Sequence, residues 1–349
     1  MIEKTDLKSM TREELECECE KLGLKKFRAK QIFEWMHKKK ATDFDEMTNL
    51  SKELRNQLKE GYFLDNLTIL DVLESKIDGT KKFLFKLSDG NVIESVFMKY
   101  SFGNSVCISS QAGCKMGCRF CASGIGGLAK SLSAAQMLSQ IYQIENFTNE
   151  RVSHVVVMGS GEPFDNYENL IKFIMIISDS SGLNISKRNL TVSTCGIIPK
   201  IKEFSDLKLP VTLAISLHAP NQEKRKELMP VANKYHYDEL IESCKYFVKE
   251  TGRRITFEYS LCAGVNDSIQ DADELSKNLK GINAHVNLIP VNPVKERSFK
   301  NPLQKSVKDF KKQLENNGIN VTIRREMGRD INGACGQLRR SYIESEELG

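Results

Sequence analysis

Residues 105–124 read SVCISSQAGCKMGCRFCASG, and this stretch decides the fold. It opens with SVCISSQ, an apolar and β-branched run that is typical of a buried strand. Cys114, Cys118 and Cys121 follow at once with the spacing C-x3-C-x2-C. Three thiols on one short loop can converge on a single metal centre. The sequence therefore predicts a metal-binding loop directly after a strand.

The number of cysteines in this loop favours an iron–sulfur cluster. A structural zinc ion normally takes a fourth Cys or His nearby, and the closest histidine, His154, lies in a predicted strand. A four-iron cluster held by three cysteines keeps one iron open, which suits a substrate that must coordinate it. Phe120, between the last two cysteines, would shield such a cluster. We expect a [4Fe–4S] cluster, with zinc as the alternative.

Strand-like and helix-like stretches alternate through the rest of the chain. After the first strand, further apolar runs occur at 154–159, 189–194, 211–217, 255–261 and 285–290, with a seventh candidate at 320–325. Such alternation predicts a parallel sheet, either doubly wound or closed toward a barrel. No GxGxxG follows the first strand, and polar residues follow several strands, as at the active face of a barrel. We therefore expect an α/β fold with a partial (β/α)6 barrel.

The N-terminal third has a different pattern. Residues 1–60 predict a small helical accessory domain, in which Thr11 and Glu14 form a capping box, a second helix runs near 28–40 and a third follows Ser51. Residues 61–104 alternate polar and apolar positions around IDGT and SDGN, which are hairpin signals. We expect a helical domain at 1–60, a β-hairpin region at 61–104 and the barrel core at 105–349.

Composition and charge exclude some classes of protein. No run approaches the roughly 18 apolar residues that a membrane helix needs, and the polar N-terminus does not resemble a secretory signal, so we expect a cytoplasmic protein without a membrane segment. The net charge of +5 does not by itself indicate nucleic acid. Residues 25–40, however, carry seven Lys or Arg and one Glu. This helix is either a solvated face or an RNA-binding face.

A string of motifs resembles the RlmN/Cfr family of radical S-adenosylmethionine (SAM) RNA adenine methyltransferases. The matching segments, in order, are CISSQAGCKMGCRFCASG, VVMGSGEPFDN, STCGIIP, ISLHAPN, GVND, NLIPVNP and GACGQL. The resemblance extends over nearly the whole chain, including KFRAKQIFEWMHKKK in the N-terminal domain, and fits the RlmN-type branch best. The chain departs from the family at Ser160, where MGMGEP often has methionine, and we expect a local packing change there.

The resemblance implies two cofactors and their ligands. Cys114, Cys118 and Cys121 would hold the [4Fe–4S] cluster, and SAM would bind its fourth iron. The residues that would line the SAM site are Gly161, Glu162, Ser193, Ser216, Leu217, His218 and Asn292. From the residue types alone, Glu162 could instead be a solvated turn residue and His218 a buried structural histidine.

The resemblance also implies three residues that carry out the chemistry. Cys335 in GACGQL would receive a methyl group from SAM, and a radical derived from a second SAM would activate that methyl group toward adenine. Glu94 would take a proton from the adduct, and Cys107 would release the product by forming a transient disulfide with Cys335. From its strand position alone, Glu94 could equally face solvent. Met158 lies near the site, and we assign it no role.

The implied function is methylation of carbon 2 of an adenine in the peptidyl-transferase centre of 23S rRNA and in tRNA. The expected partners are these RNAs and an external one-electron donor of the flavodoxin or ferredoxin type. The protein itself is expected to be a monomer. The helix at 25–40 and the pairs Arg324-Arg325 and Arg339-Arg340 would contact phosphates. One alternative is Cfr-type methylation of carbon 8 of the same rRNA adenine. Another is a non-catalytic zinc- or iron-binding protein associated with RNA.

Overall fold

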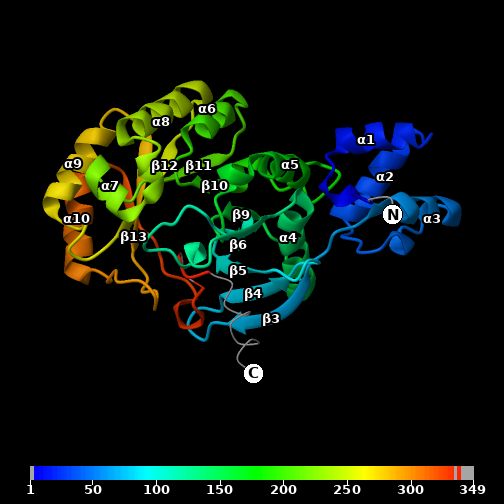
Figure 1. Cartoon of the computed structure of the whole chain (residues 1–349), viewed down its shortest axis with the longest axis horizontal. Coiled ribbons are helices and arrows are strands. Elements are labelled where there is room, and N and C mark those ends of the chain that lie inside the picture. The colour runs from blue at the N-terminus through cyan, green and yellow to red at the C-terminus, as the bar shows by residue number, and fades with distance from the viewer. Residues whose placement is uncertain (1–3, 334–335, 339–349) are drawn as a thin grey trace.

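The computed structural model describes residues 4–333 and 336–338. Its centre is a ten-stranded sheet with the strand order β14-β13-β12-β11-β10-β9-β6-β5-β4-β3 (Figure 1). The strands of this sheet are β3 (Thr68–Glu74), β4 (Lys81–Lys86), β5 (Val92–Tyr100), β6 (Gly103–Ile108), β9 (His154–Val157), β10 (Leu190–Thr194), β11 (Thr212–Ser216), β12 (Ile255–Leu261), β13 (Ala284–Pro290) and β14 (Val321–Ile323).

Seven neighbouring strands of this sheet, from β6 to β14, run parallel. Their connecting helices cover the outer face (Figure 1). These helices are α4 (Ala134–Thr148), α5 (Tyr167–Ile177), α6 (Ile198–Asp206), α7 (Gln222–Leu228), α8 (Tyr237–Thr251), α9 (Ile269–Leu279) and α10 (Gln304–Asn316). The predicted partial (β/α)6 barrel is therefore confirmed. The candidate at 320–325 forms the seventh parallel strand, β14.

The predicted hairpins form the antiparallel end of the same sheet. β3 pairs with β4, β4 with β5, and β5 with the first barrel strand β6. In the last pair Val96 lies opposite Cys107. Residues opposite one another in an antiparallel pair share a face, and alternate residues of a strand do as well. The pairing thus places Glu94, Val96 and Cys107 on one face of the sheet.

The N-terminal helices form a module of their own. Its elements are β1 (Thr5–Asp6), α1 (Arg12–Lys21), α2 (Lys26–His37), α3 (Lys52–Gly61) and β2 (Tyr62–Phe63), and β1 pairs with β2 in parallel. The predicted capping box is present, since Thr11 accepts from the Glu14 N–H and Glu14 accepts from the Thr11 N–H. Ser51 caps α3 through its side chain, which accepts from the Leu54 N–H. The second helix begins at Lys26, slightly earlier than predicted.

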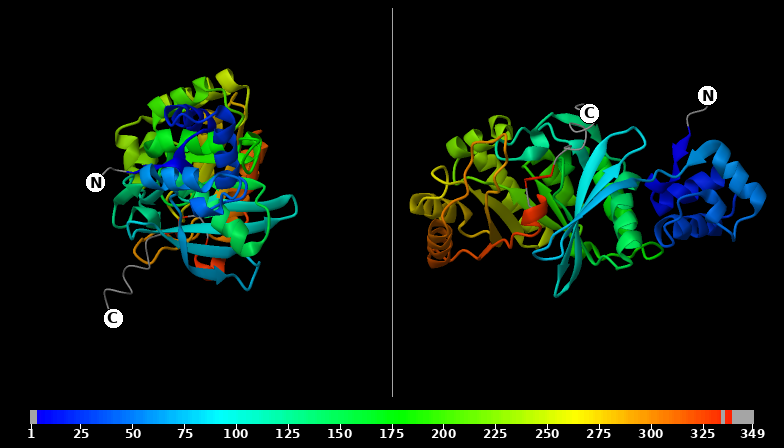
Figure 2. Two further views of the ribbon diagram at one scale, coloured as in Figure 1. Left: turned by 90° about the vertical axis from the view of Figure 1, so that its right-hand side faces the viewer. Right: turned by 90° about the horizontal axis from the view of Figure 1, so that it is seen from below.

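This module packs against α4 and α5 at one end of the barrel (Figure 2). Gln136 of α4 donates to Asp65 at 2.7 Å, and Lys40 forms an ion pair with Glu145 at 2.8 Å. His37, at the end of α2, is fully buried, and its Nδ1 lies 2.8 Å from the Tyr142 hydroxyl. In the described residues no helix is long and apolar enough to cross a membrane.

The buried His37 makes the stability of this docking pH-dependent. Burial lowers the pKa of His37 to about 3, so the native ring stays neutral below pH 6.5, where an unfolded histidine takes up a proton. The free energy of unfolding therefore falls as the pH falls below 6.5. We expect His37→Gln to reduce the slope of that free energy against pH by about 1.4 kcal/mol per pH unit between pH 6 and 4.

Urea unfolding of the metal-free protein at several pH values measures this slope. His236→Gln, at an exposed histidine, is the matched control. An unchanged slope in His37→Gln would contradict the assignment.

Candidate functional site

A short two-stranded sheet holds the cysteine loop closed. β7 (Gln111–Gly113) pairs antiparallel with β8 (Leu128–Ser131), and the Cys114 N–H donates to the Gly127 carbonyl at 3.0 Å. Gly113 has a φ of +78°, and a Cβ at this position would collide with the Gly127 carbonyl oxygen. Only glycine fits there. The chain therefore enters and leaves the loop at one fixed point.

The three cysteines of this loop are partly buried. Burial raises the pKa of Cys114 to about 12 and also raises the pKa of Cys118. Such thiols keep their protons unless a metal replaces them. Among residues 4–333 and 336–338, no three Cys, His, Asp or Glu side chains are arranged to hold a single metal ion.

The carboxyl ends of the parallel strands surround a cavity of about 940 Å³, here called the strand-end cavity. Most residues predicted to bind the cluster or SAM line it, although they come from loops far apart in sequence. They are Cys114, Cys118, Cys121, Gly161, Glu162, Ser193, Ser216, His218 and Asn292.

Glu162 is held by backbone donors. Its Oε1 accepts from the Phe164 N–H at 2.9 Å and its Oε2 from the Cys195 N–H at 2.7 Å. Burial raises the pKa of Glu162, and the Cys195 N–H opposes that rise. The side chains of Thr194 and Cys195 also hydrogen-bond to this carboxylate. Glu162 is thus a buried, oriented group, whereas a solvated turn residue would be exposed.

The residue before Glu162 has no room for a side chain. Gly161 has a φ of +105°, and an added Cβ would lie 2.5 Å from Cβ of Gln111. Gln111 in turn accepts from the Glu162 N–H at 2.9 Å. Close approach of these two loops therefore fixes where the carboxylate points.

His218 is a neutral hydrogen-bond donor in the same cavity, and its ring lies edge-on to Phe120 of the cysteine loop, with the ring centroids 4.8 Å apart. Its Nδ1 accepts from the Ser260 N–H at 2.9 Å, and burial lowers the pKa of the ring to about 3. The single ring proton therefore lies on Nε2. His218 has a φ of +57°, uncommon for a residue other than glycine. Asn266, in the GVND segment, stabilises this backbone by donating to the His218 carbonyl at 2.8 Å.

Two predicted residues, Leu217 and Glu94, line neither this cavity nor the second one described below. Leu217 is fully buried in the main hydrophobic core, and its N–H donates to the Glu258 carbonyl at 3.1 Å. Glu94 is 1% exposed and forms an ion pair with Lys82, itself buried, at 3.2 Å. Glu94 is thus not the solvent-facing carboxylate that its strand position alone allowed.

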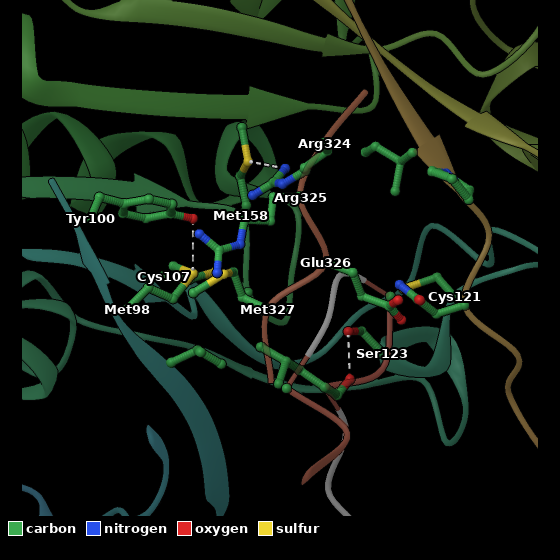
Figure 3. Close-up of a pocket in the computed structure, with 18 residues that line it drawn as sticks. Met98, Tyr100, Cys107, Cys121, Ser123, Met158, Arg324, Arg325, Glu326 and Met327 are labelled. Atoms are coloured by element: carbon green, nitrogen blue, oxygen red, sulfur yellow. Dashed lines mark hydrogen bonds between the residues drawn. The ribbon is translucent and has the colours of Figure 1, made fainter. Parts of the chain in front are cut away.

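A second cavity of about 810 Å³, here called the tail cavity, adjoins the first. The two share walls that include Cys121, Ser123, Met158 and Asn292. Cys107, Met98 and Tyr100 lie on one side of the tail cavity, and Cys121 and Ser123 on the other (Figure 3). Segment 324–338 supplies further lining residues: Arg324, Arg325, Glu326, Met327, Gly333, Gly336 and Leu338.

Cys335, Arg339 and Arg340 lie outside the described residues. The described residues near Cys335 are tied to the cysteine loop. The Ala122 N–H donates to the Gly336 carbonyl at 2.8 Å, and the Ser123 hydroxyl donates to the Leu338 carbonyl at 2.8 Å. Ser160, the departure noted in the sequence, also reaches Ser123, with their hydroxyl oxygens 3.2 Å apart.

Sequence reasoning missed a buried charge network between the cavities. Glu258 on β12 accepts from the Asn287 amide at 2.9 Å and lies 3.7 Å from Nη1 of Arg324. The same Nη1 is 3.5 Å from the sulfur of Met158. Burial raises the pKa of Glu258, whereas the Arg324 charge opposes that rise. The sequence does contain a sign of this network, because ITFEYSL has a carboxylate in the middle of a largely apolar strand.

Comparison with known proteins identifies the family. Residues 5–63 match the family model of the ribosomal RNA large subunit methyltransferase N-terminal domain, and residues 108–275 match the radical SAM superfamily. A protein of Lachnospira eligens named "Probable dual-specificity RNA methyltransferase RlmN" is 61% identical over 97% of each chain. The chain belongs to the RlmN family of radical SAM methyltransferases.

Other RlmN relatives and a solved structure agree with this assignment. A Lachnoclostridium phytofermentans protein of the same name is 58% identical over 98% of this chain and 96% of its own. A crystal structure of a radical SAM methyltransferase from Sphaerobacter thermophilus superposes with a TM-score of 0.91 and 41% identity. It covers 97% of this chain and 100% of that one.

The residues present fit the [4Fe–4S] cluster and SAM that the radical SAM family implies. Three thiols line one wall of the strand-end cavity among the apolar side chains of Met116, Phe120 and Met229. An oriented carboxylate, hydroxyl groups and a neutral imidazole line the rest, which suits the amine, carboxylate and ribose of SAM. A fully buried arginine, Arg225, lies behind this wall and has two nitrogens without hydrogen-bond partners among the described residues.

Two cysteines of the same wall provide a matched test of the cluster ligands. We expect Cys118→Ala to hold little iron and sulfide after anaerobic reconstitution, because it removes one of three ligands. Cys195→Ala removes a buried thiol that lines the cavity but lies outside the C-x3-C-x2-C motif, and we expect it to keep the wild-type content. Iron and sulfide analysis measures both. Full iron content in Cys118→Ala would contradict the ligand assignment.

Proposed function

We propose that the protein methylates carbon 2 of adenine in 23S rRNA and in tRNA, using two SAM molecules and the thiols of Cys335 and Cys107. The supporting observation is the lining of the tail cavity. Gly333 and Gly336, on either side of Cys335 in sequence, line it together with Cys107 and with the cluster-loop residue Cys121. A thiol carried on this segment would have both the cofactor site and the second thiol within one connected space.

The chemistry requires a carrier because carbon 2 of adenine is not a nucleophile, so it cannot take a methyl group directly from SAM. When bound, the [4Fe–4S] cluster and SAM supply the methyl group and one-electron activation of a carbon centre. Cys335 takes up the methyl group as a thioether and presents it to the base. An external one-electron donor of the flavodoxin or ferredoxin type supplies the electron.

Glu94 receives the proton that carbon 2 loses in the adduct between Cys335 and the base. It is buried and lies on the same sheet face as Val96, which lines the tail cavity. The Lys82 ammonium, 3.2 Å away, favours the ionised carboxylate that a base needs. Lys82 therefore acts as a positioning residue for Glu94.

Cys107 releases the product. Its thiolate attacks the sulfur of Cys335, so that a disulfide forms as the bond from that sulfur to the transferred carbon breaks. The carbon leaves with the electron pair of that bond and takes up a proton to become the methyl group. Cys107 is 7% exposed, beside Met98 and Met327, which keeps bulk water away from the thiol.

The tail cavity is also the proposed site of the adenine. Enzymes that modify a base take it out of the stack into a pocket. Tyr100 offers an aromatic edge, Met98, Met158 and Met327 offer polarizable sulfur, and Arg325 offers a cation for the adjoining phosphate.

The basic face of α2 is the proposed RNA-binding surface. Ala29, Ile32, Phe33, Met36 and His37 are buried on one side of the helix. The other side carries the exposed cations Lys25, Lys26, Lys30, Lys38 and Lys39. The Lys39 ammonium lies 3.5 Å from the Trp35 ring centroid, and Phe27 is exposed. Cations and exposed aromatic rings together suit phosphates and unstacked bases.

We further propose that residues 1–60 bind RNA, that residues 61–104 supply the proton acceptor and that residues 105–349 carry out the radical chemistry. We also propose that the protein is a cytoplasmic monomer. Cfr-type methylation at carbon 8 remains the alternative regiochemistry, and the names of the relatives favour the RlmN type.

Nucleoside mass spectrometry tests the regiochemistry. A strain lacking the gene should lose 2-methyladenosine from both 23S rRNA and tRNA, and expression of the wild-type protein should restore it. Unchanged 2-methyladenosine would refute the proposal, and loss of 8-methyladenosine instead would assign the carbon-8 activity.

The two-thiol scheme makes a separate prediction. We expect Cys107→Ala to accumulate a covalent protein–RNA adduct, because the step that releases Cys335 is lost. Cys335→Ala should form neither adduct nor product, since it cannot take up the methyl group. Cys262→Ala removes a buried thiol outside both cavities and should behave as wild type. Denaturing gels with labelled RNA measure the adduct, and normal turnover by Cys107→Ala would contradict the scheme.

A further inference from the structure

Arg225 on α7 is a fully buried guanidinium with incomplete hydrogen bonding. Its side chain has no exposed surface. Nη2 donates to the Cys195 carbonyl at 2.6 Å and makes a long contact of 3.5 Å with the Ser216 carbonyl. Nε and Nη1 have no partner in the part of the chain that the structure describes. Burying a cation without a full set of hydrogen-bond partners costs free energy. We therefore expect a group of opposite charge nearby.

No carboxylate compensates this charge. Within residues 4–333 and 336–338, Arg225 has no acidic side chain at ion-pair distance, unlike the half-buried Arg324, which faces Glu258. Of the side chains that act electrostatically on Arg225, those of Cys195 and Cys118 act most strongly, and both thiols are uncharged as long as they keep their protons. Burial lowers the pKa of Arg225, and a negative charge on either thiol would oppose that effect. Deprotonation of Cys118, which metal binding requires, would place a negative charge that acts on this cation.

The position of Arg225 is directly behind the strand-end cavity. Cys195 and Ser216, whose carbonyls it contacts, both line that cavity, and so does Cys118. The guanidinium also lies against Gly196, where an added Cβ would be 3.3 Å from Nη2. The cation thus lies against the backbone of two residues that line the cavity, without access to solvent.

We propose that Arg225 is the buried counter-charge of the iron–sulfur cluster and raises its reduction potential. This inference rests on the cluster assignment made above. Three thiolates make the cluster site negative, and reduction adds one more negative charge. A fixed cation in a low-dielectric interior stabilises the reduced state more than the oxidised one. The step is a one-electron transfer from the external donor to the cluster, with no bond or proton exchanged.

A purely structural role is the competing explanation, because Arg225 joins the ends of β10 and β11 through two carbonyls. Two variants separate these roles. Arg225→Gln retains an N–H donor but removes the charge. Arg225→Lys keeps the charge but cannot present the planar pair of donors. Lys226→Gln removes an exposed cation from the next position of α7 and is the matched control.

The experiment uses the full chain, reconstituted anaerobically with iron and sulfide in the absence of SAM. Iron content is measured first, and electron paramagnetic resonance then follows the reduced cluster during potentiometric titration. At the wild-type midpoint potential, we expect a tenfold lower ratio of reduced to oxidised cluster in Arg225→Gln, which corresponds to a shift of 59 mV to lower potential. Arg225→Lys and Lys226→Gln should stay close to wild type.

Each outcome decides the question. A fully loaded Arg225→Gln with the wild-type midpoint overturns the proposal. If Arg225→Gln does not retain iron, Arg225→Lys decides: full iron and the wild-type midpoint support the charge, and loss of iron supports the structural role. Absence of iron from the wild-type protein would instead overturn the cluster assignment itself.

Discussion

The parallel pairing of β6 and β9 to β14 is the constraint on which the site depends. Neighbouring parallel strands end at one edge of the sheet, so the loops that follow them meet there. The cysteine loop, the segment around Glu162, the STCG turn and the segment around His218 are separated by tens of residues in the chain. Their side chains share one cavity because the register of the strands brings them together.

Charge in this cavity is controlled by burial and by backbone donors. Glu162 accepts from two backbone N–H groups, and His218 is kept neutral with its proton on Nε2. Glu258 faces Arg324 across the wall between the two cavities. Such fixed groups do not need to reorganise when a charged ligand binds, which is the usual basis of an efficient polar site. Arg225 is the exception, because we propose that its compensating charge is carried by the iron–sulfur cluster.

The antiparallel strands have a different consequence. Because β5 pairs with β6, the strand that leads to the cysteine loop also carries Cys107 beside Val96, and Glu94 lies further along the same face. The segment from Arg324 to Leu338 covers this face and is bonded to the cysteine loop through Ala122 and Ser123. The hairpin region is therefore a wall of the site as well as an extension of the sheet.

The sequence by itself determined the strand–helix alternation, the capped N-terminal helices and the cysteine loop, because periodicity, caps and close spacing are local properties of the chain. It also predicted that the residues after the strands lie near one another, because the carboxyl ends of parallel strands meet at one edge of a sheet. Only the tertiary structure decided the rest. Leu217 turns into the core, Glu94 pairs with Lys82, and Arg225 is buried with no carboxylate partner in the part of the chain that the structure describes. The direction in which a side chain points and the residues that it contacts depend on segments distant in sequence. A local sequence pattern cannot predict either of them.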